Sequence, residues 1–409
     1  MSVTADLSYE RVFDAEVYGD GDPTTFGLPL DLYDRMRREA PVVNLHLNDQ
    51  MLIDEVWAVT RHDYICEIGR DSENFVSNRG LPTIWRHSPV DPVNKPGLLV
   101  QDGEVHRSRR IVIGKAFRPT AINKYEAKFR EYAAAVVAGA IEKGTFDFIT
   151  EIAHALPVQA LGDVMGVPEG DRPKFFDWVD KFTSPYDPRV APSFEEVGQA
   201  LLDIWAYGLE QVARKRREPA DDVLSRIAEM DISDDEVMGH VAIFATGAAE
   251  STSAALGHGL HELMRNPQQA AWLRERAGDI PATVAQEMVR ISNPGISILR
   301  TAAHDIDFHG VRMREGDRVA PVFPAGNFDP DAIADPRRFD VARDPNPHVA
   351  FGRGTHTCIG KHVAAFEIKI LLEALLARTK DIQPAGPISY IKSNVTRGVY
   401  SLPVTVTPA

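Results

Sequence analysis

The sequence predicts a mainly helical protein of the α+β class that folds as a single domain over residues 1–409. From residue 103 to about residue 292, apolar residues recur at helical spacing. Short strand-like segments occur only in the first hundred residues and in the last third, which is the pattern of an α+β fold. With 44% hydrophobic residues, the chain also has enough apolar material for one large core.

The expected elements follow in a mixed, then helical, then mixed order. Residues 57–69 predict a strand that runs into a helix, and the proline-rich residues 79–97 predict a long irregular loop, which is uncommon unless functional. Amphipathic or buried helices are expected at residues 106–117, 122–144, 194–218 and 281–292. Strands are expected within residues 296–313 and 317–323, followed by a terminal hairpin within 395–409.

Residues 233–265 predict one very long central helix. Ser233 is a good N-cap with acidic residues after it, and the segment ends just before an Asn-Pro pair. At 1.5 Å per residue the helix would run for roughly 50 Å. Its middle is apolar on nearly all sides, so we expect it at the centre of the protein.

Charge and composition exclude several classes of protein. A net charge of −14 disfavours a nucleic-acid-binding protein, which would show a basic face. The acidic N-terminal segment lacks the features of a secretory signal, and no apolar run is long enough to span a bilayer. Two cysteines cannot form a disulfide framework. We therefore expect a cytoplasmic monomer.

Cys358 stands in the segment FGRGTHTCIG, residues 351–360, directly before a strong amphipathic helix. Gly352 and Gly354 allow an unusual backbone path, and the following helix terminus is expected to lower the pKa of the thiol. Such a cysteine is a nucleophile, a metal ligand or a buried structural residue. A zinc site would need more ligands than the nearby His356 and His362.

A haem needs one protein ligand to iron and cations for its two propionates, which suits the rest of the chain. Cys66, by contrast, falls on a probable helix with no cationic cluster in the sequence around it, and is expected to be structural.

Residues 351–360 resemble the haem-binding signature of the cytochromes P-450 at each defining position, including Phe351, His356, Cys358 and Gly360. Three further motifs occur in the order of that family, so the resemblance extends over roughly the whole chain and is strongest to soluble bacterial members. It implies a cytochrome P-450 fold with a long helix over the haem, haem b as cofactor and the Cys358 thiolate as axial ligand of the iron. Such a thiolate favours O–O cleavage.

The second motif is the pair Glu287 and Arg290, three residues apart on a helix. Alone it is weak, because such pairs are common on helix surfaces. The resemblance implies a buried pair that holds the cysteine-bearing segment, with Arg338 as the third partner.

The third motif supplies the propionate donors. His106 and Arg110 are four residues apart and share one helix face. The resemblance adds Arg300 and His356 to this set. Two buried carboxylates require such charge-assisted donors.

The fourth motif, in the middle of the long helix, concerns oxygen. The resemblance aligns Glu250 with the acid and Ser251 with the threonine of the usual pattern, and Ala248 replaces a glycine. A carboxylate, a hydroxyl and water can relay the two protons that O–O cleavage requires. Thr252 is an alternative hydroxyl, although it should face about 100° away.

The resemblance also implies a monooxygenase that uses dioxygen, a small apolar substrate and electrons from a separate ferredoxin. The chain has no dinucleotide-binding loop or flavin domain, and a local basic patch for docking is expected from residues close to the motifs, namely Arg107, Arg109, Lys115, Arg353 and Lys361. By family position the substrate walls are Leu98, Leu99, Ile243, Thr246, Gly247, Ile296, Ile298, Val395 and Thr396.

This mostly aliphatic set favours a compact apolar molecule, and a terpenoid or steroid-like compound is expected. An apolar carboxylic acid is an alternative, anchored by a cation of the proline-rich loop: Arg79, Arg86, His87 or Lys95. A haem-thiolate peroxygenase or isomerase is a further alternative, and the retention of Glu250 and Ser251 argues against it.

Overall fold

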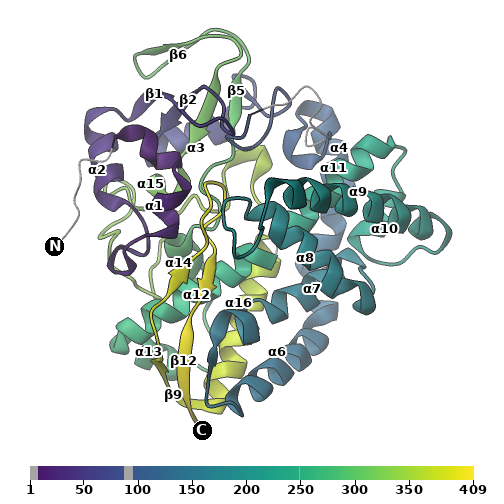
Figure 1. Cartoon of the computed structure of the whole chain (residues 1–409), viewed down its shortest axis with the longest axis vertical. Helices are drawn as coiled ribbons and strands as arrows, with labels where there is room; N and C mark the ends of the chain where they lie inside the picture. Colours follow the sequence, from purple (N-terminus) through teal and green to yellow (C-terminus); the bar gives the residue numbers. More distant parts are fainter. Residues whose placement is uncertain (1–7, 87–94, 248) are drawn as a thin grey trace.

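The computed structural model describes residues 8–86, 95–247 and 249–409 and is mainly helical, with a sheet at each end of a helical body (Figure 1). The α+β prediction is confirmed. The helices are α1 (Ala15–Gly19), α2 (Leu30–Glu39), α3 (His62–Arg70), α4 (Gly103–Ile113), α5 (Pro119–Ile122), α6 (Glu126–Ile141), α7 (Ala155–Met165), α8 (Arg172–Thr183), α9 (Phe194–Arg217), α10 (Val223–Ala228), α11 (Asp234–Thr246), α12 (Ala249–Arg265), α13 (Pro267–Arg274), α14 (Ala282–Ser292), α15 (Phe323–Asn327) and α16 (Lys361–Arg378). Among the described residues, no helix has the length and apolar character needed to cross a membrane.

The larger sheet has five strands in the order β1-β2-β8-β5-β3 and lies at one end of the body. Its strands are β1 (Val42–His46), β2 (Glu55–Val59), β3 (Phe75–Val76), β5 (Arg300–Ala302) and β8 (Arg318–Pro321). Strand β2 pairs with β8 in parallel, and the other neighbours are antiparallel. The predicted strand-to-helix passage at residues 57–69 is present as β2 followed by α3.

The smaller sheets account for the remaining strands. They are β4 (Thr145–Asp147), β6 (Ile306–Phe308), β7 (Val311–Met313), β9 (Thr379–Pro384), β10 (Ser389–Tyr390), β11 (Val399–Ser401) and β12 (Pro403–Pro408). Strand β12 lies between β4 and β9 at the other end of the body, and β10 pairs with β11. The predicted terminal hairpin is wrong: only Leu402 separates β11 from β12, which is too short for a reversal.

The residues predicted as one long helix, 233–265, are assigned to two helices, α11 and α12, and the backbone of Gly247 after α11 still has right-handed helical dihedral angles. Ser233 caps α11 as predicted, by accepting a hydrogen bond from the backbone N–H of Glu236 (3.2 Å). At the junction, Gly247 has no side chain and is a poor helix former, and the Ser251 hydroxyl donates to the Gly247 carbonyl (2.9 Å). Ala248 lies outside the described residues.

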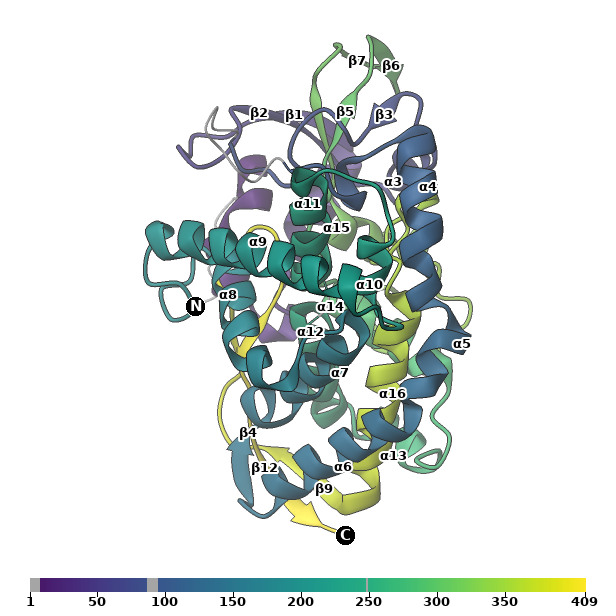
Figure 2. The same ribbon diagram turned by 90° about the vertical axis from the view of Figure 1, so that its right-hand side faces the viewer.

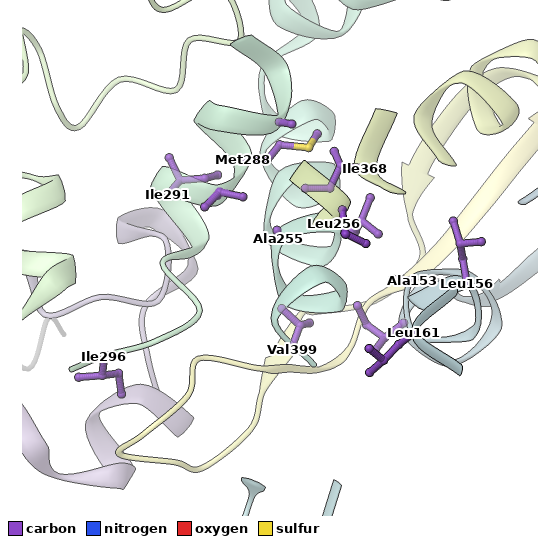
Figure 3. Close-up of a cluster of buried hydrophobic side chains, with 14 of the residues drawn as sticks. Ala153, Leu156, Leu161, Ala255, Leu256, Met288, Ile291, Ile296, Ile368 and Val399 are labelled. Atoms are coloured by element: carbon purple, nitrogen blue, oxygen red, sulfur yellow. The ribbon is translucent and has the colours of Figure 1, made fainter. Parts of the chain in front are cut away.

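Helix α12 is nevertheless central, as expected. It packs against α14, α16 and α7, and Figure 2 shows it inside the body. Figure 3 shows Ala255 and Leu256 of α12 beside Met288 of α14 and Ile368 of α16. These residues belong to one buried hydrophobic cluster that draws on side chains from Val12 to Val406. The rigid core thereby fixes where the polar residues at the start of α12 lie.

Candidate active site

A cavity of about 450 Å³ lies beside the junction of α11 and α12. Its walls also include residues of α4, of the segment before β5 and of the loop that precedes α16. Every motif singled out in the sequence except the Glu287–Arg290 pair contributes a lining residue. Segments far apart in the chain therefore meet at one internal space.

The loop before α16 brings the Cys358 thiol to the wall of this cavity. Gly352 and Gly354 have positive φ angles of 68° and 74°. A Cβ atom on Gly354 would lie 1.8 Å from the carbonyl oxygen of Gly69, so only glycine lets the loop pack against α3. The backbone N–H of Cys358 donates to the carbonyl of Phe351 (2.8 Å), which closes the loop. The thiol is surrounded by protein and yet exposed to the cavity.

The structure corrects the predicted pKa of this thiol. Burial raises the pKa of Cys358, while the backbone N–H groups of Gly360 and Lys361 and the charge of Arg110 lower it by less. The loss of hydration raises the pKa of Cys358 by more than the backbone N–H groups at the start of α16 lower it. A stable thiolate here therefore needs a further positive charge, such as that of a metal ion bound to the sulfur.

The four predicted propionate donors meet at one side of the cavity. The rings of His106 and His356 have centroids 4.2 Å apart, and Arg110 donates to the carbonyl of Thr357 (2.5 Å). Arg110, Arg300 and His356 line the cavity. Burial lowers the pKa of His106 to about 4 and that of Arg300 to about 10. The cluster is thus short of negative charge.

Asp102 adds a carboxylate to this cluster, and the sequence analysis missed it. It accepts hydrogen bonds from the backbone N–H groups of Ser77 and Asn78 (both 2.8 Å) and lies 3.5 Å from His356 Nε2. Burial raises the pKa of Asp102, but the interaction with His356 and the two backbone bonds bring it below its usual value. An Asp before a helix suggests an N-cap, yet its side chain makes no cap bond here.

Glu250, Ser251 and Thr252 all line the cavity. Glu250 Oε1 accepts a hydrogen bond from the Thr396 hydroxyl (3.0 Å), a residue predicted only as a substrate wall. Thr252 interacts instead with Glu367 of α16, which the sequence analysis also missed. Burial raises the pKa of Glu250 to about 7 and that of Glu367 to about 8. Two carboxyl groups that hold protons near neutral pH therefore border the cavity.

All the predicted substrate-wall residues except Ile296 line the cavity. Those that do are Leu98, Leu99, Ile243, Thr246, Gly247, Ile298, Val395 and Thr396. The side chain of Ile296 is fully buried in the main hydrophobic cluster, where Figure 3 labels it. Ile296 and Ile298 precede β5, which begins only at Arg300. The alternation of side chains along a strand therefore does not place Ile296 on the same face as Ile298.

Large side chains that the sequence analysis did not single out complete the wall: Trp85, Phe182, Leu201 and Trp205. On an amphipathic helix, such residues look like ordinary core positions. Only their place in the assembled structure identifies them as part of the cavity.

The candidate carboxylate anchors of the proline-rich loop are already paired. Arg79 binds Glu315 (2.9 Å), Arg86 binds Asp54 (2.5 Å) and Lys95 binds Asp235 (2.6 Å). Of these three, Lys95 alone lines the cavity. His87 lies outside the described residues.

Comparison with known proteins agrees with this geometry. The family model "Cytochrome P450" matches residues 281–385. A steroid C26-monooxygenase of Mycolicibacterium smegmatis is 31% identical over 365 residues, which cover 86% of this chain and 84% of the relative. The chain belongs to the cytochrome P450 family. A methyl-branched lipid omega-hydroxylase of Mycobacterium tuberculosis is 30% identical over 383 residues, covering 90% of this chain and 89% of the relative. The crystal structure of CYP108D1 from Novosphingobium aromaticivorans matches with a TM-score of 0.86 and 26% identity over 98% of both chains.

The P450 family, its fold and the haem b cofactor are thereby confirmed, as is a monooxygenase that acts on apolar substrates. The residues of the cavity fit a haem. His106 Nε2 is buried and has no hydrogen-bond partner among the described residues. Among the same residues, the side chain of Arg300 donates from Nη1 to the carbonyl of Leu299 (2.9 Å). Two propionates would supply the missing acceptors, and Cys358 would supply the iron ligand.

In this P450 the Glu287–Arg290 pair is fully buried, with N–O distances of 2.7 and 2.8 Å. The predicted third partner, Arg338, is wrong. Its side chain is 60% exposed and turns to Asp340, whereas Arg343 reaches Glu287 Oε2 (3.2 Å). Arg338 contributes only its carbonyl, which accepts from Arg290 and Arg343. The network thus ties α14 to the stretch that leads to the cysteine loop.

Only some side chains of the predicted basic patch are available to contact a partner, because others bind groups of the protein itself. Arg109 is drawn inward by Glu236 (2.6 Å), and Arg353 donates to the carbonyl of Pro347 (2.6 Å). Arg107 and Lys115 are exposed, although Arg107 lies 3.3 Å from Glu104. Exposed Val105 and Ile111 lie on the same helix, α4.

Cys66 lies in a buried cluster of α3 and the larger sheet, as a structural residue should. Its surroundings differ from the expectation, because His62 and Arg353 both approach the sulfur, His62 to 3.9 Å. Burial raises the pKa of Cys66, and the interactions with His62 and Arg353 more than offset this and lower it. His62 stands four residues before Cys66 on α3, whereas Arg353 reaches the sulfur only through the fold.

Proposed function

We propose that this P450 hydroxylates the end of a branched alkyl chain on a neutral, mostly apolar substrate of the steroid or terpenoid type. The observation that carries the proposal is the cavity, which has the Cys358 thiol in its wall and aliphatic or aromatic side chains over most of the remainder. The two named relatives support oxidation at a chain end, since one is a steroid C26-monooxygenase and the other a methyl-branched lipid omega-hydroxylase.

The chain's residues have distinct roles in this proposal. Cys358 holds the iron, and His106, Arg110, Arg300 and His356 hold the propionates. When bound, the haem activates dioxygen for insertion of one oxygen atom into a C–H bond. Glu250 gives a proton to the cavity from its carboxyl group, which is partly protonated at neutral pH. The Ser251 hydroxyl takes part in positioning that proton, and the apolar walls exclude bulk water.

The ion pairs of the loop cations favour a neutral substrate. A carboxylate bound in the cavity would have to displace Asp235 from Lys95. The distance between Lys95 Nζ and Asp235 Oδ1 is 2.6 Å. Arg79 and Arg86 do not line the cavity. An unpaired carboxylate in apolar surroundings is strongly disfavoured.

A matched pair of ligands tests this proposal. One is a neutral steroid with a branched alkyl side chain, and the other has the same skeleton with that chain ending in a carboxylate. We expect the neutral compound to shift the ferric absorbance spectrum at a concentration about tenfold lower. We also expect mass spectrometry of its product to place the hydroxyl at the chain end.

Lys95→Gln and Arg86→Gln are the matched variants, since Arg86 forms its ion pair away from the cavity. Both variants should bind the neutral ligand like the wild type. The contrary result is that the wild type binds the acid more tightly than the neutral compound and that only Lys95→Gln loses this preference. The substrate would then be a carboxylic acid anchored at Lys95.

We further propose that the enzyme is a cytoplasmic monomer. A small acidic ferredoxin then delivers the electrons to the face formed by Arg107, Lys115, Val105 and Ile111. Exposed apolar side chains between exposed cations suit a partner with an acidic rim. Reduction by such a ferredoxin should slow as salt rises, because screening weakens exposed charge pairs. A rate that does not change with salt would contradict this surface.

A further inference from the structure

We propose that His62 is a positioning residue that holds the side chain of Arg353, and that the charge of Arg353 favours reduction of the bound haem. The inference rests on the proposed ligation of the iron by Cys358 and extends it to the helix that supports the cysteine loop (residues 351–360). His62 is the first residue of α3, and Arg353 lies in the loop that carries Cys358. The two side chains meet at one backbone carbonyl, that of Pro347.

The Pro347 carbonyl receives a hydrogen bond from each of these side chains. His62 Nε2 lies 2.9 Å from its oxygen, and Arg353 Nη2 donates to the same oxygen (2.6 Å). A carbonyl oxygen can only accept, so the His62 ring carries a proton on Nε2. The two bonds together fix the orientation of the Pro347 carbonyl and the place of the Arg353 guanidinium.

Helix α3 gives this contact a rigid support. The backbone N–H of His62 donates to Asp329 Oδ2 (2.9 Å), so the start of α3 is tied down independently of the His62 ring. Towards the end of α3, a Cβ atom on Gly69 would lie only 2.9 Å from the Cβ atom of Arg353, so the loop packs directly on the helix. Loss of the imidazole would therefore leave α3 in place and remove one of the two donors of the Pro347 carbonyl.

Arg353 brings a positive charge to the cavity that the Cys358 thiol also lines. It makes no ion pair with a carboxylate in the part of the chain that the structure describes, so its charge is not neutralised there. Reduction of the haem adds one electron, and a positive charge nearby favours the reduced state. Arg353 is half-buried, so its guanidinium can move out into solvent once the Pro347 carbonyl is free to turn.

Equilibrium redox titration of the substrate-free holoenzyme, at one fixed pH, tests the proposal without turnover. At a given potential, we expect His62→Ala to lower the ratio of reduced to oxidised haem about threefold. His62→Gln should restore the wild-type ratio, because its amide N–H has a similar reach and can donate to the Pro347 carbonyl. Rescue by an uncharged amide would identify the hydrogen bond, rather than the ring or its charge, as the cause.

Arg353→Gln isolates the charge, since glutamine still offers an amide donor to the Pro347 carbonyl. It should lower the same ratio about threefold or more. Adding His62→Ala to Arg353→Gln should cause no further change, because the position of an uncharged side chain no longer affects the potential.

Cys66→Ala is the matched control. The Cys66 sulfur lies 3.9 Å from both ring nitrogens of His62, and its removal leaves the bond to Pro347 intact. This variant should titrate like the wild type, and a lowered ratio in it would show that His62 acts through the thiol instead.

A wild-type ratio in His62→Ala or in Arg353→Gln would overturn the proposal, as would additive effects in the double variant. Loss of haem in His62→Ala that His62→Gln does not restore would overturn it as well. Failure of Cys358 as the iron ligand would appear separately, as an unshifted Soret band in the carbon monoxide complex of the wild type.

Discussion

Replacing Glu287 by glutamine is expected to lower the free energy of unfolding by about 3–5 kcal/mol. The reason is that Arg290 is fully buried and would keep its positive charge without a carboxylate. Arg343 and Asn346 would lose the same acceptor, since both bind Glu287 Oε2 (3.2 and 3.0 Å). Urea denaturation, with haem content measured alongside, checks this expectation.

Arg343 and Arg338 provide the controls for that network. Arg343→Gln should destabilise the protein by about 1–3 kcal/mol, because its side chain is 9% exposed and bound to Glu287. Arg338→Gln should change stability by less than about 0.5 kcal/mol, because its side chain is 60% exposed. The reverse order would show that Arg338 is the third partner after all.

Replacing Glu250 by glutamine is expected to reduce product formation about a hundredfold, the lower end of what a positioned proton donor contributes. The haem spectrum and the consumption of reducing equivalents should persist, because Glu250 does not hold the cofactor. Product yield per reducing equivalent is the measurement. A yield equal to the wild type would remove Glu250 from the proton pathway.

The wild-type yield should also depend on pH. Burial raises the pKa of Glu250 to about 7, so the carboxyl group holds its proton below that pH and loses it above. Product formation should therefore fall as pH rises through about 7, and this limb should be absent in Glu250→Gln. Thr396→Val should move the limb to higher pH, because the Thr396 hydroxyl stabilises the charged form.

The parts of the site that lie within one short segment were predictable from the sequence. Gly352, Gly354 and Cys358 are placed by local backbone geometry, and His106 and Arg110 by the period of one helix. The resemblance to the cytochromes P-450 also implied that these motifs meet at one cofactor. In the structure these segments meet at one cavity, as expected.

The errors arose where a distant segment decides the outcome. Arg338 and Arg343 stand five residues apart in an irregular stretch, and only the path of that stretch brings Arg343 to Glu287. The interruption at Gly247 has a local cause instead, because hydroxyl groups bond to carbonyls four residues earlier, which competes with an apolar pattern favouring one helix.

The central claim is that Cys358 binds the haem iron, and one spectrum tests it most directly. The purified protein is reduced with dithionite, carbon monoxide is added, and the difference spectrum is recorded for the wild type, Cys66→Ala and Cys358→Ala. We expect a far-red-shifted Soret band in the wild type and in Cys66→Ala, and its loss in Cys358→Ala. An unshifted band in the wild type, or a shifted band that survives in Cys358→Ala, would contradict thiolate ligation by this residue.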